Sequence, residues 1–227
     1  MIKSLLCVPM TILLLAGGLI AAEAPAPKAE EEAAYTATIT DRAQKHVAAL
    51  KLDDPAKAER VRDAIVKQYR ALRDLHAARD AKLKGLPAGD ESKAQADAMK
   101  VESESAVKKR HDEFLAELSA ELNETQVETI KDEMTYNVVR VTYDGFIDMI
   151  PQLTEPQKAY ILTQLKEARE IAMDQGSSRE KHGVFGKYKG RINNYLSKEG
   201  YDLKQLSKDW HARLKARQQA ATTQPAN

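Results

Sequence analysis

Aromatic, amide and charged side chains concentrate in two segments of the chain, residues 136–146 and 182–201. Five of the eight tyrosines lie in these segments, beside asparagine, aspartate, lysine and arginine residues. Carbohydrate sites use such a mixture, because an aromatic face covers the apolar side of a pyranose while polar groups bind its hydroxyls. The residues that we predict to form a ligand site are Tyr136, Asn137, Tyr143, Asp144, Lys187, Tyr188, Arg191 and Asn194. The alternative is structural, since tyrosines also serve as half-buried packing residues with hydrated hydroxyls.

Signals for catalysis are weak. The five histidines are dispersed along the chain, at His46, His76, His111, His182 and His211. None has the spacing that places two zinc ligands on one helix face, and no nucleophile elbow, phosphate-binding glycine loop or dinucleotide fingerprint occurs. A glycosidase needs two carboxylates across a sugar, for which Asp144 with Asp148 or Glu180 is a candidate pair. His182 beside Glu180 is a candidate acid/base couple. We predict no catalytic residue, no metal site and no cofactor, and keep a glycoside hydrolase as the third hypothesis.

The charge balance gives no reason to expect a nucleic-acid partner. Lys and Arg number 35 against 34 Asp and Glu, which leaves a formal net charge of +1. The distribution is uneven, because residues 181–217 hold ten Lys or Arg against three acidic residues. This basic stretch suits contact with an acidic sugar or the bacterial surface, and equally a solvated helix face.

The first 22 residues have the pattern of a signal peptide. Residues 4–22 are uncharged and rich in Leu and Ile, follow Lys3, and end in small residues that favour cleavage after Ala22. An uncleaved membrane anchor is the alternative, although Pro9 interrupts the apolar run. Cys7, the only cysteine, lies inside this segment, so cleavage leaves no thiol for a disulfide or a metal. We predict a periplasmic or secreted protein with no stable membrane insertion after cleavage.

Apolar residues repeat every three to four positions along most of the remaining chain. This period predicts an all-α, single-domain bundle of about six to eight helices. We place a disordered acidic Ala/Pro leader at 23–34, one helical domain at 35–217 and a disordered tail at 218–227. The exception to the helical period is a β-branched, alternating run near 136–144, which predicts an extended or irregular segment packed on the bundle. The long helices of the first half carry little beyond Tyr69 and Phe114 for a ligand to stack on.

Two similar segments each open a predicted helix, Leu-Asn-Glu-Thr-Gln at 122–126 and Leu-Thr-Glu-Pro-Gln at 153–157. Asn123 and Thr154 can cap these helices while the glutamines three residues later reach back, so both segments are capping boxes. Their repetition also resembles the Leu-Thr-x-x-Gln repeats of Spy-like periplasmic chaperones, although Asn123 departs from the threonine of that pattern. This resemblance implies a chaperone or envelope stress protein that binds exposed apolar segments of unfolded polypeptide, which is our second hypothesis.

A closer resemblance covers about residues 35–210. The stretches 136–151, 167–178 and 181–196 resemble an uncharacterised secreted bacterial family catalogued as sugar-binding. This resemblance implies a non-catalytic carbohydrate-binding protein and supplies no catalytic residue. Exported, non-catalytic carbohydrate binding is therefore the leading hypothesis.

Overall fold

The computed structural model of the protein describes residues 27–87 and 89–223. This part of the chain forms eight helices and no strand, which confirms the predicted all-α fold. The helices are α1 (Pro27–Ala48), α2 (Pro55–Lys84), α3 (Asp90–Glu121), α4 (Glu124–Met134), α5 (Val138–Met149), α6 (Glu155–Ala172), α7 (Ser178–Lys198) and α8 (Leu203–Thr223). None of these helices is both long enough and apolar enough to cross a membrane. The predicted signal peptide lies outside the described residues.

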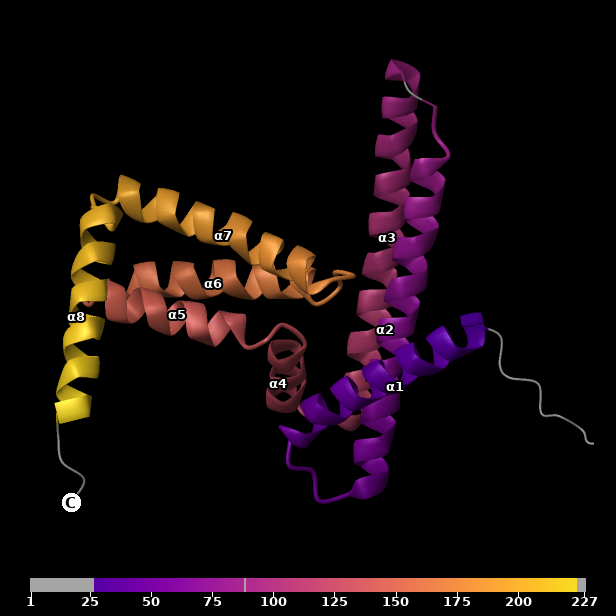
Figure 1. The fold of residues 1–227 in the computed structure, drawn as a ribbon, viewed down its shortest axis with the longest axis horizontal. Coiled ribbons are helices and arrows are strands. Elements are labelled where there is room, and N and C mark those ends of the chain that lie inside the picture. Colours follow the sequence, from indigo (N-terminus) through magenta and orange to yellow (C-terminus); the bar gives the residue numbers. More distant parts are fainter. Residues whose placement is uncertain (1–26, 88, 224–227) are drawn as a thin grey trace, which may run out of the picture.

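The helices form two groups joined by α4 (Figure 1). In the first group, α2 and α3 make a long antiparallel hairpin, and α1 crosses α2 near the lower end of that hairpin. In the second group α6 lies between α5 and α7, and α8 packs across both α5 and α7. The short helix α4 contacts α1, α3 and α6.

Each group has its own hydrophobic core. The first core is built around Ile65, Phe114 and Ile130, and the second around Ile161 and Phe185, all 1% exposed or less. Burying such side chains is the main stabilising contribution to each group, at roughly 1.5–3 kcal/mol for each large apolar side chain. Met173 directly follows α6 yet packs into the first core. The end of α6 therefore connects the two cores.

Both predicted capping boxes are confirmed. Asn123 Oδ1 accepts from the Gln126 backbone N–H at 2.9 Å, and Gln126 Oε1 accepts from the Asn123 N–H at 3.1 Å. At the start of α6, the Thr154 backbone N–H donates to Gln157 Oε1 at 3.0 Å. These contacts satisfy backbone N–H groups that a helix start leaves without partners. The glutamines of the repeated segments thus have a structural role.

The prediction of an extended or irregular segment near 136–144 is wrong from Val138 onward, because α5 runs over Val138–Met149. Val139, Phe146 and Ile150 are buried in the second core at spacings that place them on one helix face. This burial outweighs the strand preference of β-branched residues, which depends strongly on context. Only the turn before α5 is irregular, with Tyr136 at φ 60° and Asn137 at φ 55°.

Both ends of the helical region extend beyond the predicted domain limits. Helix α1 begins at Pro27, so residues 27–34 of the predicted disordered leader are helical. Glu32 accepts from Arg70 at 2.6 Å and from Arg73 at 2.7 Å, which ties this part of α1 to α2. At the other end α8 continues to Thr223, through part of the predicted tail. Both extensions are rich in Ala, Glu, Lys or Gln, which are good helix formers.

Candidate functional site

The predicted site residues before and on α5 point to different places. Asn137 donates from Nδ2 to Glu133 Oε1 at 2.8 Å, which holds the turn between α4 and α5. Asp144 is exposed, and its Oδ2 lies 4.0 Å from Arg140 Nη1. Tyr143 lines a groove between α4, α5 and α6, whereas Tyr136 lines a separate pocket.

The predicted site residues on α7 do not join those on α5. Tyr188 is 9% exposed and belongs to the second core, with the Arg191 guanidinium 4.4 Å from its ring centroid. Lys187 and Asn194 are exposed. Among the described residues, no hydrogen bond, ion pair or ring contact links these four to Tyr136, Asn137, Tyr143 or Asp144, and α6 lies between the two helices (Figure 1).

The carboxylates considered for glycosidase chemistry are engaged elsewhere. Asp148 accepts from Trp210 Nε1 at 2.7 Å and from Arg217 at 3.0 Å. Glu180 accepts from the Ser177 hydroxyl at 2.8 Å, at the start of α7. His182 stacks on Tyr136 with ring centroids 5.6 Å apart. The structure therefore offers no pair of opposed, free carboxylates among these residues.

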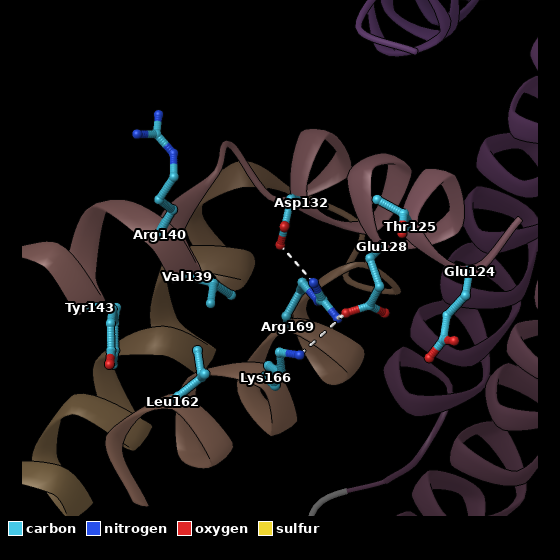
Figure 2. A pocket seen from close by; sticks show the side chains of 10 residues that line it. All are labelled: Glu124, Thr125, Glu128, Asp132, Val139, Arg140, Tyr143, Leu162, Lys166 and Arg169. Carbon is cyan, nitrogen blue, oxygen red and sulfur yellow. Dashed lines mark hydrogen bonds and ion pairs between the residues drawn. The ribbon is translucent and has the colours of Figure 1, made fainter. Parts of the chain in front are cut away.

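The groove that contains Tyr143 has a volume of about 430 Å³ (Figure 2). Tyr143, Val139 and Leu162 form its apolar wall. At its centre the Arg169 guanidinium, 2% exposed, donates to Asp132 Oδ1 and to Glu128 Oε2, each at 2.7 Å. The charged groups around Arg169 thus satisfy one another, which leaves few free donors or acceptors for a ligand at the centre of the groove.

A second hollow of about 360 Å³ lies between α1, α2 and the corner that joins α6 to α7. We call it the tyrosine pocket, because three tyrosines from three different elements line it. Its aromatic and cationic lining residues are Tyr35, Tyr69, Tyr136, Arg42, Arg73 and Lys181. Of the predicted site residues, only Tyr136 lines this pocket.

The tyrosines of this pocket are held by contacts between α1 and α2. The Tyr35 hydroxyl donates to the Tyr69 carbonyl oxygen at 3.1 Å, and the Arg73 guanidinium lies 4.2 Å from the Tyr35 ring centroid. The Tyr69 hydroxyl lies 3.0 Å from Nε2 of the buried His46. Burial raises the pKa of Tyr69 far above its ordinary value, so this hydroxyl stays protonated. Two rings are thereby fixed in position.

Tyr136 stands at the rim in a strained backbone conformation. Its φ of 60° lies in the left-handed region, which costs a non-glycine residue roughly 1–2 kcal/mol. The side chain is 47% exposed even though it is a large aromatic residue. Such strain is retained where the surrounding structure supports it, and it is concentrated at functional sites.

The α6–α7 corner is anchored to the first group through Asp174, which is 6% exposed. Its carboxylate accepts from Gln68 Nε2 at 3.2 Å and lies 2.7 Å from His111 Nδ1, while its carbonyl oxygen lies 2.8 Å from His76 Nε2. A Cβ on Gly176 would lie only 3.2 Å from the His76 ring, so any larger residue at this close approach would require the ring to shift. These contacts position the wall of the tyrosine pocket that α7 supplies.

We expect His46 to make stability depend on pH. Burial lowers its pKa from 6.5 to about 4, so the unfolded chain binds a proton more readily than the folded chain between these values. Stability from His46 is present above pH 6.5 and is lost as the pH falls toward 4. The difference in unfolding free energy between wild type and His46→Gln should decrease by about 2 kcal/mol from pH 7 to pH 5, as measured by urea titration. A difference that does not change with pH would contradict this assignment.

Sequence reasoning missed most of the tyrosine pocket. Tyr35 and Arg42 belong to the first helix, and Tyr69 was noted only as one of the few aromatic side chains of the first half. Lys181 was noted only as part of a basic stretch, yet it is 6% exposed. A signal was present in the helical spacing of Tyr35, Ile39 and Arg42, but it did not show which face would meet α7.

Comparison with protein-family models identifies a match to a family described as "Protein of unknown function (DUF3826)", over residues 36–216. The match spans both hydrophobic cores and the tyrosine pocket except Tyr35, and the chain belongs to this family. The comparison with curated proteins found no significant match.

Proposed function

We propose that this member of the DUF3826 family is an exported, non-catalytic carbohydrate-binding protein whose site is the tyrosine pocket. The single observation that carries the proposal is the convergence of Tyr35, Tyr69 and Tyr136 with cationic side chains in one hollow. The export component is supported by the sequence of residues 1–22 alone.

The chemistry of the pocket suits a sugar ring. Tyr136 exposes a large aromatic surface at the rim, and stacking on such a surface covers the C–H face of a pyranose. Arginine and lysine side chains supply donors for ring hydroxyls, and the Ser178 hydroxyl can both donate and accept. An aromatic platform with a few convergent polar groups is the usual composition of a small-ligand site.

The acidic side chains of the pocket support binding without catalysis. Asp80 pairs with Arg79 at 2.8 Å, and Glu180 accepts a hydrogen bond from Ser177. Hydrolysis of a glycosidic bond needs one carboxylic acid and one carboxylate placed on opposite sides of it. Both carboxylates of this pocket are instead engaged by a neighbouring residue, which favours binding over hydrolysis.

We expect Tyr136→Gly to weaken glycan binding while leaving the fold intact. The substitution removes the stacking surface, worth about 0.5–1.5 kcal/mol or roughly a two- to tenfold increase in Kd. It also relieves the strain of a positive φ, which offsets the lost contact with His182, so the unfolding free energy should stay within about 1 kcal/mol of wild type. A glycan array identifies the ligand, and calorimetry then measures Kd for both proteins.

Lys51→Gly is the matched control, because Lys51 also has a left-handed φ, of 50°, and does not line the pocket. It should leave Kd unchanged. The proposal is wrong if Tyr136→Gly and Lys51→Gly bind equally well, or if wild-type protein binds no glycan on the array. In the second case, protection of unfolded proteins from aggregation would favour the chaperone hypothesis.

A further inference from the structure

The tyrosine pocket contains a buried ammonium group that forms no ion pair with a described residue. Lys181, in the first turns of α7, is 6% exposed and donates from Nζ to the Met134 carbonyl oxygen at 2.9 Å. Within the described residues it takes part in no ion pair. Burying a cation costs several kcal/mol unless an opposite charge or several hydrogen bonds compensate it. One carbonyl oxygen uses one of the three donors of this ammonium, which leaves two for another acceptor.

Arg42 adds a second cation to the same place. Its guanidinium lies 5.6 Å from the Tyr69 ring centroid, and Lys181 Nζ lies 5.8 Å from the same centroid. No ion pair of Arg42 occurs in the part of the chain that the structure describes. The two cations therefore converge on one tyrosine, and each can donate to the same bound anion.

Most other charged groups of the pocket are already paired with an opposite charge. Arg73 donates to Glu32 and to Asp74, at 2.7 and 3.0 Å. Arg79 pairs with Asp80, whereas Glu180 accepts from the neutral Ser177 hydroxyl, which does not offset its charge. Lys181 and Arg42 thus exceed the unpaired Glu180 by one charge, so the remaining charge of this hollow is positive.

The amino end of α7 also favours an anionic ligand. Ser177 and Ser178 line the pocket, and Ser177 caps the helix by accepting from the Glu180 backbone N–H at 3.2 Å. The amino end of a helix carries a partial positive charge and backbone N–H groups that favour an anion. This contribution adds to that of the two cationic side chains.

We infer that the tyrosine pocket recognises an acidic sugar, with Lys181 and Arg42 binding its anionic group while Tyr136 stacks on its ring. The inference rests on the proposed function and specifies its ligand class. Two cations beside the unpaired Glu180 leave one net positive charge, which matches one negative charge on each sugar, as in a uronic acid, better than a densely sulfated chain. The bidentate fork of arginine also matches the geometry of a carboxylate.

The test compares Lys181→Met with Lys189→Met, an exposed position on the same helix. The probes are an oligogalacturonate, the same oligomer as its methyl ester, a sulfated oligosaccharide and an array of other acidic and neutral glycans. Loss of a charge-assisted hydrogen bond should weaken binding of the carboxylated probe roughly ten- to hundredfold in Lys181→Met and less than twofold in Lys189→Met. The methyl ester should bind wild-type protein as weakly as the carboxylate binds Lys181→Met.

Arg42→Gln is the second variant, chosen because Arg42 is exposed and its replacement does not disturb a hydrophobic core. Its control is Lys45→Gln, another exposed position on the same helix. Weaker binding of acidic glycans by Arg42→Gln supports the inference even if Lys181→Met fails to fold. Preference for a sulfated probe over all carboxylated ones overturns the choice of a uronic acid. Binding of neutral glycans that both substitutions leave unchanged overturns the inference and retains the proposed function. Absence of any glycan binding overturns the proposed function itself.

Discussion

Arg169→Ala is expected to lower the free energy of unfolding by about 3–5 kcal/mol, the usual cost of removing one partner of a buried ion pair. Arg169 is 2% exposed and joins α6 to α4 through Asp132 and Glu128, at 2.7 Å each. Its removal leaves these two carboxylates close together without the cation that they share (Figure 2). The measurement is urea unfolding followed by circular dichroism at pH 7.

The pH dependence of this loss gives an independent check. Burial raises the pKa of Glu128, but the hydrogen bond from Arg169 together with the positive charges of Arg169 and Lys131 holds that pKa below the ordinary 4.5. A carboxylate with a lowered pKa stabilises the fold above the ordinary pKa, and this stability is lost as the pH falls through the folded-state value. The difference in unfolding free energy between wild type and Arg169→Ala should therefore become smaller below pH 4.5.

The control is Arg140→Ala on α5, whose exposed guanidinium lies 4.0 Å from Asp144. An exposed pair of this kind contributes about 0–1 kcal/mol, so this variant should be close to wild type. If Arg169→Ala lowers the free energy of unfolding no more than Arg140→Ala does, the cluster around Arg169 does not stabilise the junction of α4 and α6.

Phe185→Ala is expected to lower the unfolding free energy by a similar amount, about 3–5 kcal/mol. Phe185 is 1% exposed in the second core, so its removal leaves a cavity as well as losing apolar burial. Trp210, the single tryptophan, reports on the second group of helices because it lies on α8 and donates to Asp148 of α5. Tryptophan fluorescence and circular dichroism should give coincident unfolding transitions, both at a lower urea concentration than in wild type.

Phe114→Ala, a replacement of a fully buried side chain in the first core, is the matched variant. Asp174 and Met173 tie the end of α6 to the first group, so we expect the two cores to unfold together. Phe114→Ala should then shift the tryptophan transition as well. A tryptophan transition that Phe114→Ala leaves in place would show that the second core unfolds independently.

Much of the local structure was predictable because its causes lie within a few residues in the chain. The capping boxes at Asn123 and Thr154 depend on side chains and backbone groups three residues apart, and both formed as expected. The all-α fold followed from a period of three to four residues in the apolar pattern, confirmed by eight helices in the described residues. The β-branched run before Asp144 misled us, since local preference gave way to burial of Val139 and Phe146.

The candidate site depended on contacts between residues distant in sequence, and these only the tertiary structure decided. From the sequence alone, Tyr136 was a candidate for ligand binding, but its neighbours in space come from α1, α2 and α7. Tyr188, by contrast, was placed in the second core. The burial of Lys181 follows from the docking of the α6–α7 corner on α2, through Asp174 and Gly176. Periodicity shows that a helix has an apolar face, but which partner covers the rest of its surface depends on how whole helices pack.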